Sequence, residues 1–474
     1  MAPEIDVGAL DEALARTRER LLAERGEAGH WAGELSTSAL STATAVVALS
    51  LAARESRHCA DAEAHGRLVR RGLDWIASHV NADGGWGDTV RSRSNMNTTA
   101  LCWAALAVAR GPDARLAAAA AGAERWLSER SGGLDPARLA SAILAFYGDD
   151  RTFSTPILTL LALTGRLGPR AGAFAMVPQL PFELAAFPQS WYRMLRLPVV
   201  SYALPALVAI GQVRHRLGPA ACPLARIVRR ATRGRTLRVV RRMQPASGGF
   251  LEAIPLTSFV TACLAAAGVA DHAVVREGAR FLRETVRADG GWPIDTDLAT
   301  WVTTLSVNAL ASGGLLKEAL TPAERRGIAD WLLAQQHAKV HPFTGAEPGG
   351  WGWSDRPGSI ADADDTPGAL IALHNLAADD PRVLRAARMG VRWLLRLQNR
   401  DGGVPTFCRG WNRLPFDRSA ADITAHTARA LALWSDRLPE GMRLCAMRAC
   451  RRALACLARS GRADGSDSYR PTRG

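Results

Sequence analysis

The sequence predicts an all-α protein made of helix hairpins, and three observations support this fold class. One unit recurs along the chain: an amphipathic helix ending in W-L or F-L, a Gly-rich turn, and an Ala/Leu-rich helix. In the clearest copies the turn is D-G-G, which supplies a left-handed bend after a helix, and the following Trp can pack back between helices. Alternating Val/Ile/Thr runs of the kind that indicate strands are almost absent. Such hairpins either stack in a line or close into an α/α barrel.

The chain opens with a charged segment, residues 1–30, whose pattern is helical, followed by a degenerate copy of the unit. The clear copies then follow in order, and the last residues hold another degenerate copy. The clear copies are residues 72–89, 123–134, 279–293, 329–353 and 391–404. Two interruptions divide the array: a Pro-rich apolar stretch from 153 to 212, and an Arg-rich stretch directly after it.

Composition excludes several classes of protein. The chain has 474 residues, 48% hydrophobic and 22% charged, so it can bury a full core and is neither a disordered tail nor a fibre. The eight cysteines form no C-x-x-C pair, so neither a disulfide framework nor a zinc ribbon is indicated, and a reducing cytosol fits best. The first residues lack the apolar core of a secretion signal. The apolar stretches 35–53 and 197–213 are expected to be buried core helices rather than membrane spans.

The Arg-rich stretch predicts an anionic partner. Residues 214–242 contain ten arginines and no acidic residue, within a chain of net charge +14 at pH 7. Leu, Ile and Val interleave with the arginines as they do in an interfacial helix on anionic lipid, while a solvated surface or a linker is the plainer alternative. Nucleic acid is the weaker interpretation, because no aromatic residue interleaves and no binding motif is present.

A carboxylate cluster stands in the segment PGGWGWSDRPGSIADADDTPGAL. Asp362, Asp364 and Asp365 lie directly before Thr366-Pro367, where a helix is expected to begin. The cluster could cap that helix or hold a hard cation. Alternatively, three carboxylates held close cannot all ionise cheaply, so one keeps its proton and serves as a Brønsted acid.

Two further features favour the acid. Asp422 and His426 stand four residues apart on one helix, suited to a hydrogen-bonded pair touching the cluster or to two metal ligands. Aromatic residues lie in or just after the Gly-rich turns, and a few facing one cavity would stabilise a carbocation. They are Trp86, Trp292, Trp301, Trp351, Trp353, Phe407 and Trp411. An acid beside a π-lined pocket suits protonation of an alkene.

These residues resemble the squalene–hopene cyclases and related class II terpene cyclases. DADDT at 362–366 looks like the family's D-x-D-D-T acid motif; it follows a PGG-aromatic turn and precedes DITAH at 422–426 in similar order. The segments 137–149, 176–204 and 247–259 also fall where the family has counterparts. The resemblance covers nearly the whole chain.

The resemblance implies two α/α barrel (toroid) domains with an apolar cavity between them, and lipid entry through a monotopic membrane contact at the Arg-rich stretch, about 213–243. It divides the chain into an N-terminal helix that associates with the catalytic barrel (1–30), a first barrel (31–245) and that catalytic barrel (246–474). The expected location is the inner face of the cytoplasmic membrane.

The roles implied by the resemblance are specific. Asp364 would donate the proton. Asp362 and Asp365 would hold the Asp364 side chain and tune its acidity, and His426 with Asp422 would keep Asp364 acidic. No cofactor and no metal are expected. The residues expected to contact substrate are Trp301, Trp351, Trp353, Trp191, Phe407 and Trp411.

Two departures from the family qualify these expectations. Val302-Thr303 follow Trp301 where squalene enzymes carry an acidic residue and Thr, so one polar wall position is lost. The chain also ends where the family continues, so the catalytic barrel is expected to be shortened at its C-terminal end. It would then close alone, be completed by a homodimer or partner chain, or be inactive.

Three functions remain open on the sequence. The first is proton-initiated cyclisation of squalene or a similar polyprenyl chain, with a prenyl diphosphate as the alternative substrate. The second is a zinc-dependent barrel of the protein-prenyltransferase type, with Cys408, Asp422 and His426 as ligands. The third is a non-catalytic barrel that binds lipid or a partner cyclase.

Overall fold

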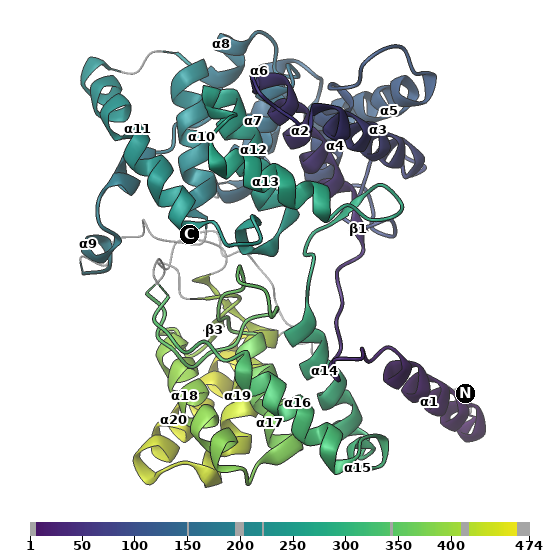
Figure 1. Ribbon diagram of the computed structural model, residues 1–474, viewed down its shortest axis with the longest axis vertical. Coiled ribbons are helices and arrows are strands. Elements are labelled where there is room, and N and C mark those ends of the chain that lie inside the picture. Colours follow the sequence, from purple (N-terminus) through teal and green to yellow (C-terminus); the bar gives the residue numbers. More distant parts are fainter. Residues whose placement is uncertain are drawn as a thin grey trace. The chain divides into compact units, whose positions relative to one another are not determined.

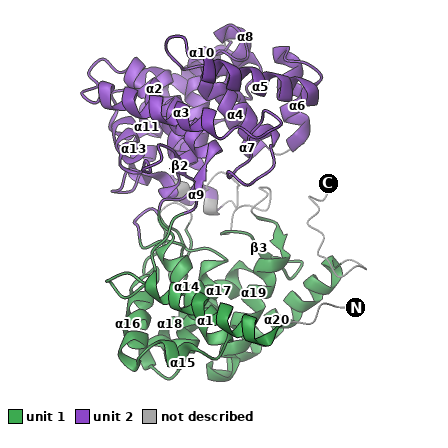
Figure 2. Cartoon of the chain, turned by 90° about the vertical axis from the view of Figure 1, so that its right-hand side faces the viewer, with its two compact units in different colours: residues 1–34, 297–355, 359–474 green, residues 35–296, 356–358 purple. Residues whose placement is uncertain are grey.

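The computed structural model describes residues 6–148, 151–194, 203–219, 222–341, 345–408 and 417–461, and helices dominate it (Figure 1). The chain forms two compact units (Figure 2). Unit 1 comprises residues 1–34, 297–355 and 359–474, and unit 2 comprises 35–296 and 356–358. The all-α fold expected from the sequence is confirmed.

Unit 2 is a closed ring of inner helices covered by outer ones. Each inner helix packs against the next, and α2 also packs against α12, so the ring closes on itself. The inner helices are α2 (Ala39–Glu55), α4 (Met96–Leu106), α7 (Arg151–Leu163), α10 (Leu204–Leu217) and α12 (Ile254–Leu264). The outer helices are α3 (Ala62–Ser78), α5 (Ala114–Ser131), α6 (Pro136–Tyr147), α11 (Pro223–Met243) and α13 (Ala273–Glu284). Shorter turns of helix are α8 (Arg170–Ala175), η1 (Phe182–Ala186), α9 (Gln189–Met194), η2 (Phe250–Glu252) and the π turn η3 (Ala265–Val269).

Composition explains which helices lie inside. α2 and α4 are apolar or Ser/Thr-rich on every side and bury most of their residues. α13 instead carries one apolar stripe and places its charged residues outside. A helix that is apolar all round must be covered on all sides, whereas an amphipathic helix can form the outer layer.

A short strand pair joins the two ends of unit 2. β1 (Thr37–Ser38) pairs antiparallel with β2 (Trp292–Pro293), with Thr37 opposite Pro293 and Ser38 opposite Trp292. Residues 246–296, which the sequence analysis groups with the second barrel, therefore contribute α12, α13 and β2 to the same ring as α2.

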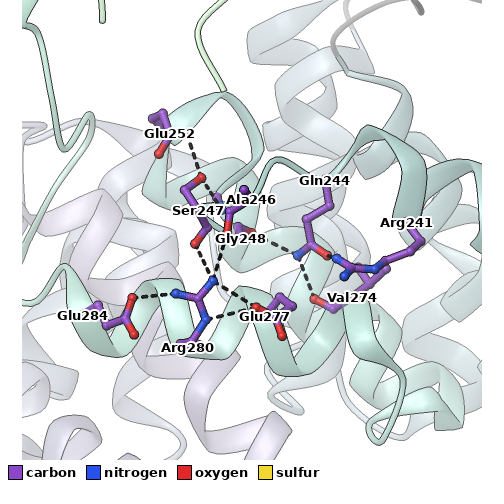
Figure 3. A network of polar contacts seen from close by, with 11 residues as sticks. Arg241, Gln244, Ala246, Ser247, Gly248, Glu252, Val274, Glu277, Arg280 and Glu284 are labelled. Atoms are coloured by element: carbon purple, nitrogen blue, oxygen red, sulfur yellow. Dashed lines mark hydrogen bonds and ion pairs between the residues drawn. The ribbon is translucent and has the colours of Figure 1, made fainter. Parts of the chain in front are cut away.

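A polar network fixes the Gly-rich turn between α11 and α12 (Figure 3). Gln244 Nε2 donates to the carbonyls of Gly248 and Val274, at 3.0 Å each. The Arg280 guanidinium of α13 donates to the carbonyl of Ser247 at 3.0 Å. The turn and the outer helix α13 are thereby held to the end of α11.

Unit 1 has the same two layers, but its inner helices form an arc. α17 packs against α14 on one side and α19 on the other, while α14 and α19 do not pack extensively on each other in the described part of the chain. The inner helices are α14 (Ala299–Ser312), α17 (Asp365–Ala377) and α19 (Ala421–Trp434). The other helices are α1 (Val7–Ala23), α15 (Leu316–Ala319), α16 (Pro322–Ala334), α18 (Pro381–Leu397), η5 (Ser435–Arg437) and α20 (Glu440–Ser460). β3 (Val404–Pro405) pairs antiparallel with β4 (Ser419–Ala420).

The segment after α1 is anchored in unit 1. Trp31 is buried; its backbone N–H donates to Thr303 Oγ1 at 3.1 Å and its indole N–H donates to the Leu21 carbonyl at 2.7 Å. His30 stacks on Trp331, with ring centroids 4.0 Å apart. Among the described residues of both units, none of the helices combines the length and the hydropathy needed to span a membrane.

Candidate active site

The turn before α4 in unit 2 shows how the repeat begins an inner helix. The Trp86 backbone N–H donates to Thr99 Oγ1 (3.0 Å), and the Asn95 N–H donates to the Trp86 carbonyl (2.9 Å). Asn95 Oδ1 accepts the N–H of Thr98 at 2.9 Å and so caps the helix. We call this arrangement the frame of the repeat: the capping residue stands four positions before the Thr whose hydroxyl accepts the backbone N–H of the Trp.

The same frame begins α17 in unit 1. The Trp351 N–H donates to Thr366 Oγ1 (3.0 Å), and the Asp362 N–H donates to the Trp351 carbonyl (2.9 Å). Asp362 Oδ1 accepts the backbone N–H groups of Asp364 and Asp365, at 2.9 and 2.8 Å. Asp362 therefore occupies the capping position of the repeat, as the plainer interpretation of the cluster expects.

Unlike Asp362, Asp364 makes no side-chain cap bond to the helix, and its partners come from other helices. Its Oδ1 lies 3.1 Å from Nδ1 of His426 in α19, and its Oδ2 accepts the indole N–H of Trp301 in α14 at 3.2 Å. Its side chain is 40% exposed, whereas Asp362 and Asp365 are buried. Asp364 is thus the carboxyl of the three that has both polar partners and open surface.

Burial raises the pKa of the other two carboxyls. It raises the pKa of Asp362 to about 7, a rise that hydrogen bonds from Asp365 and the backbone moderate. Burial, with the neighbouring charge of Asp362, raises the pKa of Asp365 well above its ordinary range. Asp365 therefore holds its proton more strongly than Asp362, to which it is hydrogen-bonded, in line with the argument that closely held carboxylates cannot all ionise.

Gly368 is a positioning residue that the sequence analysis missed. A Cβ at this position of α17 would lie 3.1 Å from Thr304 Oγ1 and 3.5 Å from His426 Cε1. The absence of a side chain lets α14 and α19 approach α17 at the level of the acid. A Gly inside an otherwise apolar helix was the available signal, since such a residue often marks close packing.

Aromatic residues adjoin the acid within unit 1. The Trp301 backbone N–H donates to the Trp353 carbonyl at 3.1 Å, and the Trp353 and Phe407 rings are 5.5 Å apart between centroids. The Phe407 carbonyl accepts the N–H of Ala363 at 2.7 Å, which ties this residue to the acid motif. Three of the residues expected to contact substrate are thus gathered beside the carboxylate cluster.

The remaining expected site residues lie elsewhere or in other roles. Trp351 has no exposed surface, and its indole N–H donates to the Leu332 carbonyl at 2.7 Å, so it packs in the core of unit 1 rather than presenting a face to a cavity. Trp191 belongs to unit 2, where it is 54% exposed. Trp411 lies outside the described residues. Asp422 is exposed in the first turn of α19, and its side chain makes no hydrogen bond or ion pair within the described chain; His426 contacts Asp364 without it.

The residues of the alternative zinc site are not assembled as three ligands. Burial, with the nearby charges of Asp362 and Asp417, raises the pKa of the Cys408 thiol, the opposite of what a thiolate ligand needs. Over the parts of the chain that the structure covers, no group of three or more His, Cys, Asp or Glu side chains is arranged to hold a metal ion.

Sequence comparison finds one family across most of the chain. The profile described as squalene-hopene cyclase N-terminal domain matches residues 14–203, and that described as squalene-hopene cyclase C-terminal domain matches residues 298–469.

Individual relatives match over shorter segments. Sporulenol synthase of Bacillus subtilis is 29% identical over 198 residues, which is 37% of this chain and 30% of the relative. Squalene–hopene cyclase of Alicyclobacillus acidocaldarius is 28% identical over 200 residues, which is 37% of this chain and 29% of the relative. The matched segments thus span less than a third of the relatives' own lengths.

Solved structures show a similar fold. Abietadiene synthase from Abies grandis aligns with 94% of this chain and 48% of its own, at a TM-score of 0.54 and 13% identity. An ent-copalyl diphosphate synthase from Arabidopsis thaliana, solved with (S)-15-aza-14,15-dihydrogeranylgeranyl thiolodiphosphate, aligns with 94% of this chain and 52% of its own, at a TM-score of 0.52 and 15% identity. At these identities the likeness concerns the fold alone.

Proposed function

The chain belongs to the squalene–hopene cyclase family, and from that premise we propose that it cyclises a linear polyprenyl substrate by protonation, with Asp364 as the acid. The observation that carries the proposal is the environment of Asp364. It is the carboxyl with open surface and two ring nitrogens as partners, while its two neighbours are buried and bonded to each other or to the helix.

The chemical step is a proton transfer from oxygen to carbon. The O–H bond of protonated Asp364 breaks, a C–H bond forms at one carbon of a terminal double bond, and the neighbouring carbon becomes the cation. The carboxylate left behind is stabilised by the Trp301 indole N–H and by a His426 N–H, whose atoms are already at hydrogen-bond distance. Hydrogen bonds to the carboxylate stabilise the product of the proton transfer and so favour the transfer.

The surrounding residues then have distinct roles. Asp362 fixes the backbone of the motif through its two N–H contacts, and Asp365 is a buried neutral neighbour. Trp301, Trp353 and Phe407 are the residues proposed to stabilise the cation, each by about 0.5–2 kcal/mol when water is excluded. Loss of a proton, or capture of water, ends the reaction.

The substrate class follows from this chemistry. Squalene or a similar triterpene is the first choice, because the step needs only a terminal alkene. A prenyl diphosphate offers the same alkene and is the alternative, so the two substrates have to be compared directly.

Membrane contact is proposed for α11. Leu224 and Ile227 are 71% and 65% exposed between its arginines, a pattern typical of a helix lying on anionic lipid. Sedimentation with anionic vesicles tests this: Leu224→Ser with Ile227→Ser should reduce binding, and undiminished binding would refute a contact through these side chains.

The activity is tested with the full chain in detergent, incubated separately with squalene and with geranylgeranyl diphosphate. We expect a cyclic product from one of them, and none from Asp364→Asn, which removes the transferable proton while preserving shape. Asp436→Asn makes the same change at an exposed position of unit 1 and should behave as wild type. Full activity of Asp364→Asn would refute the assignment.

A further inference from the structure

Unit 2 contains a cavity of about 370 Å³ that the proposed cyclisation does not use. It lies between α10, α11 and the segments η1 and η3, and its volume is within the range of about 300–1,000 Å³ usual for small-molecule sites. Its wall is lined by arginines. They are Arg216, Arg226, Arg229, Arg230 and Arg233.

The positive charge of this wall is compensated only in part. Glu183 forms a two-oxygen contact with Arg229 Nε, at 3.2 Å to each oxygen. Arg216 and Arg233 both donate to one carbonyl oxygen, that of Ala267, at 2.9 and 2.8 Å. Two guanidinium groups that converge on one neutral acceptor repel each other, and an anion between such groups would relieve that repulsion.

Two arginines of α11 are free to bind a ligand. Arg226 and Arg230 line the cavity and are exposed, and their side chains have no hydrogen bond or ion pair in the described part of the chain. They stand four residues apart on one helix, so their side chains lie on the same face. Guanidinium groups placed in this way present forked N–H donors to tetrahedral oxyanions.

The positive charges of these arginines lower the pKa of neighbouring basic groups. Burial, the Arg229 charge and the charges of Arg226 and Arg230 lower the pKa of His215, against the opposing effect of Glu183. Burial and the Arg216 charge likewise lower the pKa of Arg233. The described cavity is therefore a region of net positive potential.

A buried polar atom on the same wall lacks a partner. Gln212 is 3% exposed; its Nε2 donates to Thr236 Oγ1 at 3.0 Å, but its Oε1 has no hydrogen-bond partner among the described residues. This oxygen needs a donor, such as a hydroxyl or a water molecule that accompanies a bound anion.

We propose that this cavity binds a phosphate group, with Arg226 and Arg230 as its direct ligands and Arg216, Arg229 and Arg233 as the charged wall. The phosphate belongs either to a phospholipid headgroup or to a soluble phosphate or diphosphate, since the guanidinium chemistry is common to both. The site is separate from the acid of unit 1 and does not depend on the cyclisation proposed above.

Binding to the full-length protein tests the site, with two probes that distinguish the sources. Inorganic pyrophosphate is titrated calorimetrically, and phosphatidylcholine vesicles with or without phosphatidic acid are used in sedimentation. The test variant is Arg226→Gln/Arg230→Gln. The matched control is Arg235→Gln/Arg238→Gln, which removes the same charge from exposed positions of α11 that do not line the cavity.

We expect the test variant to bind roughly 10- to 100-fold more weakly, and the control to stay within about threefold of wild type. Loss seen with pyrophosphate identifies a soluble ligand as sufficient; loss seen only with phosphatidic acid vesicles identifies a lipid headgroup. Equal loss of affinity in both variants would show that binding depends only on the total positive charge of α11, and would overturn the proposal. Failure of the wild type to bind either probe would also overturn it. Thermal unfolding of both variants checks that the fold is kept.

Discussion

The first turns of α4 in unit 2 and α17 in unit 1 share a backbone frame but differ in their side chains. In each, a polar residue caps the helix four positions before a Thr that accepts the N–H of a buried Trp. Asn95 has this position in α4 and Asp362 has it in α17. The first Asp of the acid motif is therefore the repeat's own capping residue, and Asp364 and Asp365 are the chemical additions.

The two units also differ in how their inner helices close. In unit 2 the inner helices complete a ring, whereas in unit 1 they form an arc over the described residues. The arc nevertheless surrounds the acid on both sides, because α14 supplies Trp301 and α19 supplies His426. The polar partners of Asp364 thus need no helix beyond these three.

The largest expected effect separates Asp364 from Asp362. Asp364→Asn should reduce turnover by roughly 10³-fold or more, because the transferable proton is lost. Asp362→Asn keeps an oxygen for the two backbone N–H groups and should lose at most about tenfold. Steady-state turnover on the active substrate measures this, and equal losses would show that capping and acid functions cannot be separated.

The next effect concerns the partner on α19. His426→Ala should slow turnover by roughly 10- to 100-fold, because a hydrogen bond to the developing carboxylate is lost, while Asp422→Ala should stay within about twofold. The same assay measures both. A larger loss in the Asp422 variant would restore the sequence-based role of that residue and contradict the geometry.

The third effect is on stability and pH. Because burial raises the pKa of Asp362 to about 7, the folded state binds more protons than the unfolded chain between about pH 4 and 7. The free energy of unfolding should therefore fall as pH rises through this window, with at most about 1.4 kcal/mol per pH unit coming from Asp362. The pKa of Asp365 is raised as well, so this group adds a second loss over the same window, and Asp365→Asn should flatten the slope. Denaturant unfolding at several pH values tests this, with Asp436→Asn as control; a slope unchanged by Asp365→Asn would contradict it.

The smallest effect compares the two caps directly. Asn95→Ala and Asp362→Ala should each lower the free energy of unfolding by about 0.5–2 kcal/mol, because each removes a side chain that accepts a backbone N–H at a helix start. The comparison is made below pH 6, where Asp362 is largely neutral. If only one of the two variants is destabilised, Asn95 and Asp362 do not stabilise the first turns of their helices in the same way, which contradicts the prediction.

The fold class and the position of the acid motif could be predicted from the repeat, because the D-G-G and G-G-W turns and the apolar helices depend on local sequence. The contacts that complete the site are not local: Trp301 lies 63 residues before Asp364 and His426 lies 62 after it. A contact between His426 and the cluster was expected from its spacing to Asp422 and from the family resemblance, whereas Trp301 was expected to contact substrate rather than to bond the acid. Asp422 was over-interpreted, since a spacing of four places residues on one face without fixing how far each reaches.

The residues at which the helix ring of unit 2 ends could not be predicted from the sequence either. Thr37 pairs with Pro293 in unit 2, so the chain returns to its first inner helix after residue 245, where the family resemblance implied a domain boundary. The two-residue strands carry no alternation that a sequence pattern could show.

The most direct test of the central claim is cyclisation in deuterated water, followed by mass spectrometry of the product. Transfer from Asp364 to the alkene requires that each product molecule from the wild type gain one solvent-derived deuterium on the carbon that was protonated, and that Asp364→Asn give no product. A cyclic product without deuterium at that carbon, or one formed equally by the Asn variant, would contradict the account.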